Sequence, residues 1–228
     1  LLTATALAAL TNWFARWRDN ESLETWVKPL TTMLVIGLAI ANDAEIKYAG
    51  VAVRALVLCL EGDIALMPVV DKFIVGLASF LLGHLAFIVL FVRYGMPHRG
   101  LAAIAIGGAL VLAATAGRVI VRGAARKDPA MRIPVVAYLL VICAMTVCGW
   151  ATGRGWVIAG TTLFVISDTL LGWGRFARDE QPRSSNNTRL HSALHSTAVI
   201  AKYHGAIAAL ALCLWSWAVF GLRCLVGR

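Results

Sequence analysis

Long apolar runs separated by short polar segments are the dominant pattern of this sequence. About 20 apolar residues are enough for a helix to cross the hydrocarbon core of a bilayer, and each run is about 15 to 25 residues long. The pattern predicts eight membrane-spanning helices: Leu1–Ala15, Trp26–Ala41, Tyr48–Met67, Lys72–Arg93, Gly100–Val121, Arg132–Trp150, Trp156–Trp173 and Ala198–Leu222. We therefore expect an all-α protein, a polytopic transmembrane helical bundle that forms a single domain over residues 1–228.

Two details of the pattern refine this prediction. No basic residue precedes the first run, so we expect a first span rather than a signal peptide. Pro29 and Pro134 are predicted to lie in the first turns of their spans, where a missing N–H group costs little.

Composition supports a membrane protein. Hydrophobic residues make up 60% of the chain and charged residues 14%, whereas a soluble domain carries about 25% charged residues. None of the five cysteines belongs to a CxxC pair, so we expect neither a disulfide framework nor a cysteine metal site.

The basic residues predict an orientation in the membrane. The net charge is +9, with 21 Lys and Arg. Alternate connections, starting with the one after the first span, hold 14 of the 21, the opposite side holds six, and Arg54 lies within a span. Cytoplasmic loops are enriched in Lys and Arg, so these connections are expected in the cytoplasm. The charge is then a topology signal and predicts no nucleic-acid partner. We expect a multi-pass location, in the inner or plasma membrane if the source is bacterial.

Two aspartates, Asp63 and Asp168, lie inside predicted spans. An aspartate at the centre of such a helix costs about 2.5–3.5 kcal/mol on insertion scales. Intramembrane carboxylates therefore indicate a functional site, and a pair of them indicates acid/base chemistry or ion handling.

Other uncommon polar groups are predicted at a similar depth, in the middle or the cytoplasmic half of the membrane. They are Lys28, His84, Tyr138, Tyr203 and His204. Together with the aspartates they place a polar group in six of the eight spans. This convergence predicts a single polar cavity open to one leaflet.

Ordinary structural roles stay open for each of these residues. Lys28 is also consistent with snorkelling at an interface, and the tyrosines with an aromatic belt. His84 and the aspartates are also consistent with hydrogen bonds between packed helices. His191 and His195 are four residues apart, a spacing that zinc sites use, so a metal-dependent reaction is a further alternative.

Short motifs occur in order from about Lys28 to Leu210, namely Lys28–Thr31, Gly62–Asp63, Phe73–His84, Pro134 with Tyr138 and Met145, Gly160–Leu170 and Tyr203–His204. This ordered set resembles the YhhN family of membrane proteins, which includes the lysoplasmalogenases. The resemblance implies an integral membrane hydrolase that cleaves the vinyl-ether bond of a lysophospholipid. It also implies that Asp63 and Asp168 are catalytic.

Vinyl-ether hydrolysis suits a carboxyl pair. One protonated carboxyl protonates the alkene, and one ionised carboxylate orients water, a division that burial and mutual repulsion favour. We expect Lys28 to bind the lipid phosphate, and Tyr138, Tyr203, His84 and His204 to orient water or the head group. No cofactor and no obligate protein partner is predicted. The alternatives are a small proton-coupled membrane transporter and a metal-dependent membrane lipid hydrolase.

Overall fold

A computed structural model describes residues 21–42, 49–67 and 69–177, together with scattered positions among residues 1–18. The described residues are helical apart from short connections and contain no strand. The elements are α2 (Glu21–Asn42), α3 (Ala49–Ala65), α4 (Phe73–Tyr94), α5 (Arg99–Leu112), the π-helical turn η1 (Ala113–Gly117), α6 (Arg118–Lys127), the 3-10 turn η2 (Pro129–Met131), α7 (Arg132–Ala151) and α8 (Gly155–Phe176). The all-α prediction is confirmed.

The second to seventh predicted spans correspond to helices. Four helical segments are long and apolar enough to cross a membrane: Phe73–Tyr94, Arg99–Lys127, Pro129–Ala151 and Gly155–Phe176. The helices α2 and α3 pack beside them. The eighth predicted span and nearly all of the first lie outside the described residues, so the count of eight stays a prediction.

Two boundaries differ from the sequence prediction by more than three residues. The fifth helical segment continues through η1 and α6 to Lys127 instead of ending at Val121, because its polar last turns still complete helical hydrogen bonds. It ends at Asp128, which is extended and accepts a hydrogen bond from the backbone N–H of Ala130 at 2.9 Å. Pro29 lies in the third turn of α2 rather than the first, because this helix already begins at Glu21.

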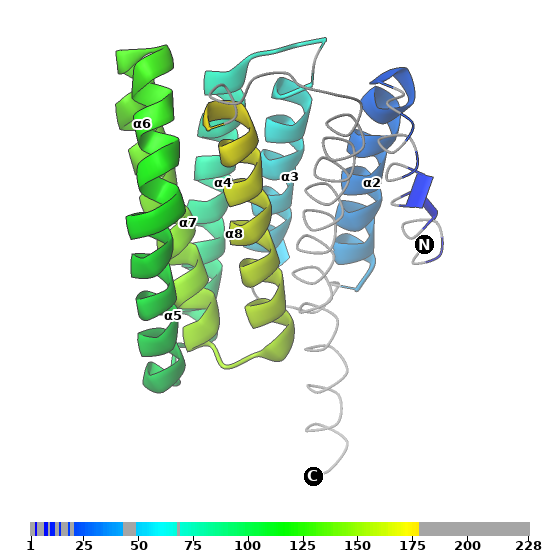
Figure 1. The fold of residues 1–228 in the computed structure, drawn as a ribbon. Helices are drawn as coiled ribbons and strands as arrows, with labels where there is room; N and C mark the ends of the chain where they lie inside the picture. Colours follow the sequence, from blue (N-terminus) through cyan, green and yellow to red (C-terminus); the bar gives the residue numbers. More distant parts are fainter. Residues whose placement is uncertain are drawn as a thin grey trace.

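The bundle is built around α4. Helix α4 packs against α3 and α7, α2 covers α3, and α8 packs against α6 and α7 (Figure 1). The α3–α4 contact is close because Gly83 faces α3. A Cβ there would come within 3.2 Å of the Ala55 carbonyl oxygen and the Cys59 sulfur. Small residues at such positions let the backbones of membrane helices approach.

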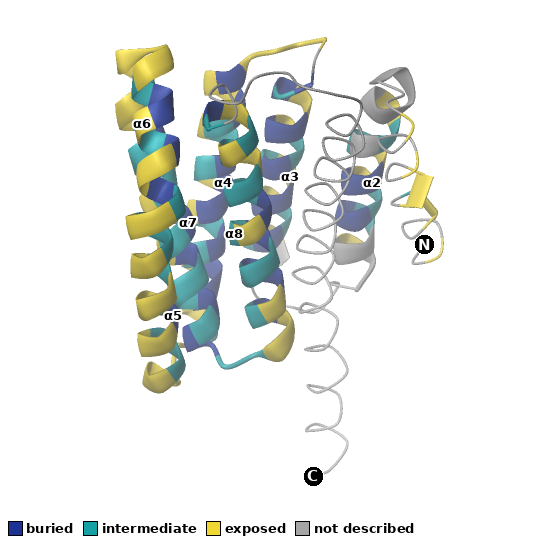
Figure 2. Cartoon of the chain, viewed as in Figure 1, coloured by how far each residue is buried: buried dark blue, intermediate teal, exposed yellow. Residues whose placement is uncertain are grey.

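Burial follows the pattern of a bundle that faces lipid. Phe87, Phe91, Ile142, Met145 and Phe164 are fully buried between the helices. Large apolar side chains are exposed on the outer faces, and α5 and α6 are mostly exposed in Figure 2. Exposed apolar faces of this extent fit a hydrocarbon solvent.

Five helix ends lie together at the upper end of Figure 1. They are the last turns of α3, α6 and α8 and the first turns of α4 and α7. Described basic residues at this end are Lys72, Arg122, Arg126, Lys127, Arg132 and Arg175, and we call it the basic end. It is the end that the distribution of Lys and Arg predicts for the cytoplasm.

Candidate functional site

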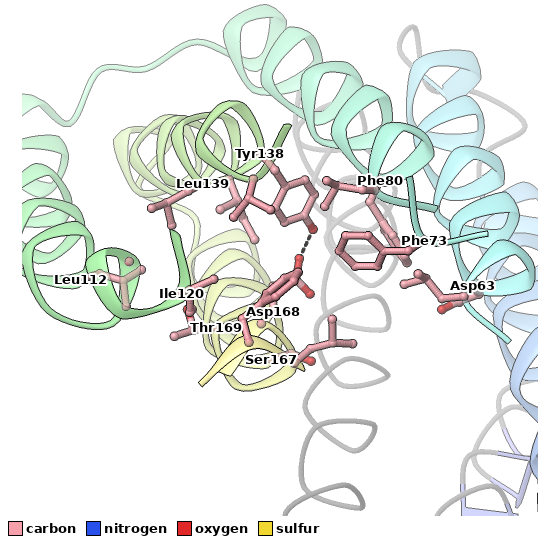
Figure 3. A pocket seen from close by; sticks show the side chains of 18 residues that line it. Asp63, Phe73, Phe80, Leu112, Ile120, Tyr138, Leu139, Ser167, Asp168 and Thr169 are labelled. Atoms are coloured by element: carbon pink, nitrogen blue, oxygen red, sulfur yellow. Dashed lines mark hydrogen bonds between the residues drawn. The ribbon is translucent and has the colours of Figure 1, made fainter. Parts of the chain in front are cut away.

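A cavity of about 100 Å³ lies inside the bundle, in the half nearer the basic end. Its walls come from α3, α4, the end of α5, η1, α6, α7 and α8, so segments distant in the sequence meet there (Figure 3). Asp63 and Asp168 both line it. The cavity therefore brings together the two intramembrane carboxylates that the sequence singled out.

Asp63 lies in the last turn of α3 and is 1% exposed. Its Oδ2 accepts a hydrogen bond of 3.1 Å from the hydroxyl of Thr32 on α2, and Thr32 is itself fully buried. A buried carboxyl group needs such partners because water is excluded. The contact fastens Asp63 to the neighbouring helix and restricts its rotamer.

Asp168 lies on α8, which packs against α7, and is half-buried. The hydroxyl of Tyr138, on α7, donates a hydrogen bond to Oδ2 of Asp168. Both residues line the cavity, and the dashed line in Figure 3 marks this bond. A neutral hydroxyl that donates to a carboxylate is a charge-assisted partner that orients the acceptor.

Phenyl rings separate the two carboxyl groups in the view of Figure 3. Phe73 and Phe80, both on α4, lie between Asp63 and the Tyr138–Asp168 pair. Most of the remaining lining is aliphatic, including Leu77, Ile120 and Leu139. The carboxyl groups therefore face a small space that is largely apolar, where electrostatic interactions are stronger than in water.

His84 lies one turn after Phe80 on α4 and is fully buried, but it is not among the residues that line the cavity. Its ring contacts Tyr138 edge-on at a centroid distance of 5.5 Å and Phe164 at 4.9 Å. The Phe80 carbonyl interacts with the imidazole, although neither ring nitrogen has a well-formed hydrogen bond within the part of the chain that the structure describes. His84 therefore lies behind Tyr138 as seen from the cavity.

The remaining predicted site residues are placed only in part. The backbone of Lys28 lies on α2, one turn before Thr32 and towards the basic end. Its side chain lies outside the described part of the structure, as do Tyr203 and His204. His191 and His195 are also outside it. Within residues 21–42, 49–67 and 69–177 there is no group of three or more His, Cys, Asp or Glu that could hold a metal ion.

Thr32 contacts a candidate site residue, Asp63, and the sequence analysis did not single it out. Thr31 and Thr32 are adjacent and both are buried, but only one of them is bonded to an aspartate in the structure: the Thr31 hydroxyl donates to the Val27 carbonyl at 2.8 Å, within its own helix. Adjacent helical residues point about 100° apart. A pair of threonines in an apolar run was the available signal.

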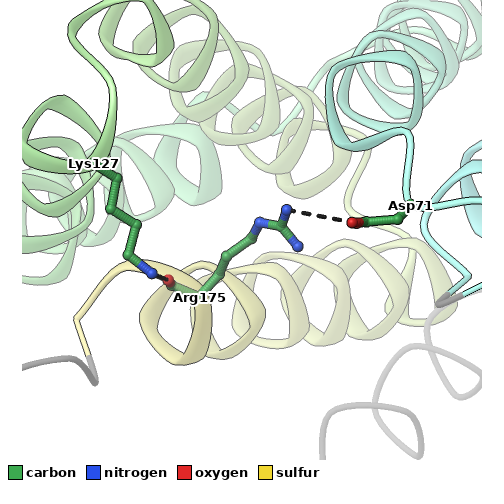
Figure 4. A network of polar contacts seen from close by, with 3 residues as sticks. All are labelled: Asp71, Lys127 and Arg175. Carbon is green, nitrogen blue, oxygen red and sulfur yellow. Dashed lines mark hydrogen bonds and ion pairs between the residues drawn. The ribbon is translucent and has the colours of Figure 1, made fainter.

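A group of polar and aromatic contacts closes the basic end beside the cavity. The Arg175 guanidinium lies 4.2 Å from the centre of the Phe73 ring and 3.9 Å from Oδ1 of Asp71. Lys127 donates a hydrogen bond of 2.7 Å to the backbone carbonyl of Arg175 (Figure 4). Phe73 also packs edge-on against Phe176 at 5.7 Å. These contacts join the ends of α4, α6 and α8 over one side of the cavity.

Comparison with known proteins gives the relatives of this chain. Lysoplasmalogenase TMEM86B of Homo sapiens is 28% identical over 172 residues, which are 73% of this chain and 70% of that protein. The lysoplasmalogenases of Mycobacterium bovis and Mycobacterium tuberculosis are 33% identical over 132 residues, 54% of this chain and 49% of each of those proteins. No solved structure matches the chain. The model of the YhhN family matches residues 23–217, so the chain belongs to the YhhN family.

Proposed function

We propose that this protein is a membrane lipid hydrolase of the lysoplasmalogenase type, which cleaves the vinyl-ether bond of a lysophospholipid with Asp63 and Asp168 as its acid/base pair. The observation that carries the proposal is that both aspartates line one small, mostly apolar cavity in the bundle. Three relatives named lysoplasmalogenase and the YhhN family match support the reaction class.

The proposed reaction uses both carboxyl groups and one water molecule. A protonated carboxyl gives its proton to the distal carbon of the alkene, and the positive charge develops on the carbon bonded to the ether oxygen. Water adds to this carbon while the ionised carboxylate takes its proton. The hemiacetal hydroxyl then gives its proton to the first carboxylate as the bond to the glycerol oxygen breaks, and that oxygen takes the proton held by the second carboxyl. This releases a fatty aldehyde and a glycerophospho-alcohol and restores the starting protonation of both carboxyl groups. This division of roles resembles that of the two carboxyl groups in glycoside hydrolysis.

The cavity offers about 100 Å³ of space that water can enter, so it has room for a water molecule beside the reacting bond. The head group and the rest of the hydrocarbon chain are proposed to extend beyond it. The nearby basic end suits a phosphate, and the apolar walls suit the start of the chain.

Tyr138 and Thr32 are proposed to position the carboxyl groups, because each donates a hydrogen bond to one of them. Phe73 and Phe80 are proposed to exclude bulk water from the cavity that they line. An oxocarbenium-like cation is attacked by any nearby water, so a restricted supply favours the oriented one. Lys28, Tyr203 and His204 stay proposed contacts of the head group or water.

The proposal is tested with the purified full chain in detergent or liposomes, incubated with lysoplasmalogen while aldehyde release is measured. Asp63→Asn and Asp168→Asn should each lower turnover by at least about 100-fold, because general acid–base catalysis contributes about 10²–10⁴-fold. Asp71→Asn is the matched control, since its side chain is 74% exposed and its ion pair with Arg175 is long. It should keep its activity within about twofold, as exposed pairs contribute little.

The two-aspartate mechanism and each alternative function are tested by separate measurements on the same preparation. Full aldehyde release by either Asp63→Asn or Asp168→Asn, with the variant folded, would contradict the two-aspartate mechanism. Turnover that is lost with a chelator and restored by metal would favour the metal-dependent hydrolase. Solute flux into proteoliposomes without lipid cleavage would favour the transporter.

A further inference from the structure

A second concave region lies on the outside of the bundle, at the seam between α6 and α7. Its volume is about 610 Å³, and it is lined by Val119, Val121, Arg122, Ala125, Arg126 and Arg132. We call it the arginine hollow. It shares no lining residue with the cavity that contains Asp63 and Asp168, so the proposed hydrolysis assigns it no role.

Charge is concentrated in the arginine hollow. Three of its six lining residues are arginines and none is acidic. Arg122 and Arg126 are four residues apart on α6 and therefore lie on one face of that helix. Arg132 begins α7 after the turn made by residues 128–131 and brings a third guanidinium to the same hollow. All three side chains are exposed.

The surroundings of the hollow indicate its depth in the membrane. Exposed apolar side chains on the helical segments that form the hollow include Val111 at 64%, Val119 at 37% and Ile133 at 78%. The arginines lie at the basic end, where charged residues replace apolar ones along α6. A helix face that changes in this way lies at the boundary between acyl chains and head groups. The hollow thus offers apolar contacts on the side of the acyl chains and guanidinium groups at the level of the head groups.

We propose that the arginine hollow binds an anionic diacyl phospholipid of the surrounding leaflet, with the phosphate on the arginines and the first part of an acyl chain along Val119 and Val121. Guanidinium groups bind phosphate oxygens with two parallel hydrogen bonds. Basic pockets between membrane helices are a known mode of anionic head-group recognition. The proposal is independent of the hydrolase function, because this lipid is a ligand that is not cleaved.

The test uses the full chain in a mild detergent, mixed with equal amounts of phosphatidylglycerol and phosphatidylcholine that carry the same acyl chains. Native mass spectrometry counts the lipid that stays bound. The wild-type protein should retain phosphatidylglycerol in preference. The triple variant R122Q/R126Q/R132Q should weaken this preference on the order of a hundredfold, and each single variant about fivefold.

The matched control is R54Q/R93Q/R99Q, which removes the same charge from exposed arginines at the opposite end of the bundle. It should keep the preference for phosphatidylglycerol. Melting temperature and elution volume verify that both triple variants are folded, and the single variants give the same comparison with smaller changes. Equal retention of the two lipids by the wild-type protein would overturn the proposal. An equal loss in both triple variants would also overturn it, because net charge alone would then explain retention.

Discussion

The hydroxyl of Tyr138 on α7 donates a hydrogen bond to Oδ2 of Asp168 on α8, at the wall of the cavity that Asp63 also lines. The bond joins two helices and sets the direction in which the carboxyl group faces. It is also the contact through which buried residues behind the cavity can influence the proposed chemistry. His84, for example, contacts the Tyr138 ring and does not line the cavity.

Tyr138→Phe should lower lysoplasmalogen turnover roughly 10- to 100-fold, because a hydrogen bond to a charged group is worth about 1.5–3 kcal/mol. Aldehyde release by the purified variant measures the loss. Tyr94→Phe removes a hydroxyl from a tyrosine on the same bundle, near Arg154 at the other end, and should leave turnover nearly unchanged. Equal activity of Tyr138→Phe and wild type would remove Tyr138 from the mechanism.

The adjacent threonines of α2 provide a matched pair. Thr32→Val removes the donor to Asp63, whereas Thr31→Val removes a bond to the Val27 carbonyl within the same helix. Both side chains are buried and valine has a similar shape, so each variant should lose a comparable amount of stability, about 1 kcal/mol. Turnover should fall about tenfold in Thr32→Val only, since one hydrogen bond to a carboxylate is at stake. A similar fall in both variants would point to general destabilisation instead.

The sequence predicted the helices better than their contacts. Apolar run length located the helical segments, and loop charge placed Asp63 and Asp168 near one end of the bundle. These features depend on transfer free energy, which is nearly additive along the chain. The family resemblance and the cost of buried carboxylates then indicated the same two residues.

Contacts between helices were not predictable in this way. The sequence contained Thr32 and Phe80, but nothing in the apolar pattern said that one bonds to Asp63 and the other lies beside the cavity. Such relationships depend on the rotation of each helix about its axis, and helices that are apolar on all sides leave that rotation undefined. The continuation of the helix to Lys127 was missed for a related reason, because polar last turns resemble a loop.

His84 is expected to act as a positioning residue through Tyr138. His84→Ala would leave a void beside the rings of Tyr138 and Phe164, and large-to-small changes in a core cost about 2–5 kcal/mol. His84→Phe retains an aromatic ring and should recover most of the stability and of kcat. KM should change little in either variant. If His84→Phe is folded and its kcat stays as low as that of His84→Ala, the imidazole itself takes part in the reaction.

The close approach of α6 and α8 at Gly123 is expected to be essential for the arrangement around the cavity. A Cβ at this position would collide with the backbone carbonyl of Phe176, and backbone cannot move aside as a flexible side chain does. Gly123→Ala should therefore lower stability by about 1–3 kcal/mol, the usual cost of overpacking. It should also displace Phe176, which lines the cavity.

Gly108→Ala is the matched control, because a Cβ there meets nothing within 4 Å and alanine favours the helix by about 1 kcal/mol. Thermal unfolding in detergent measures both variants, with a lower melting temperature expected for Gly123→Ala and an equal or higher one for Gly108→Ala. An unchanged melting temperature for Gly123→Ala would mean that α6 and α8 lie further apart in the membrane than they do in this bundle.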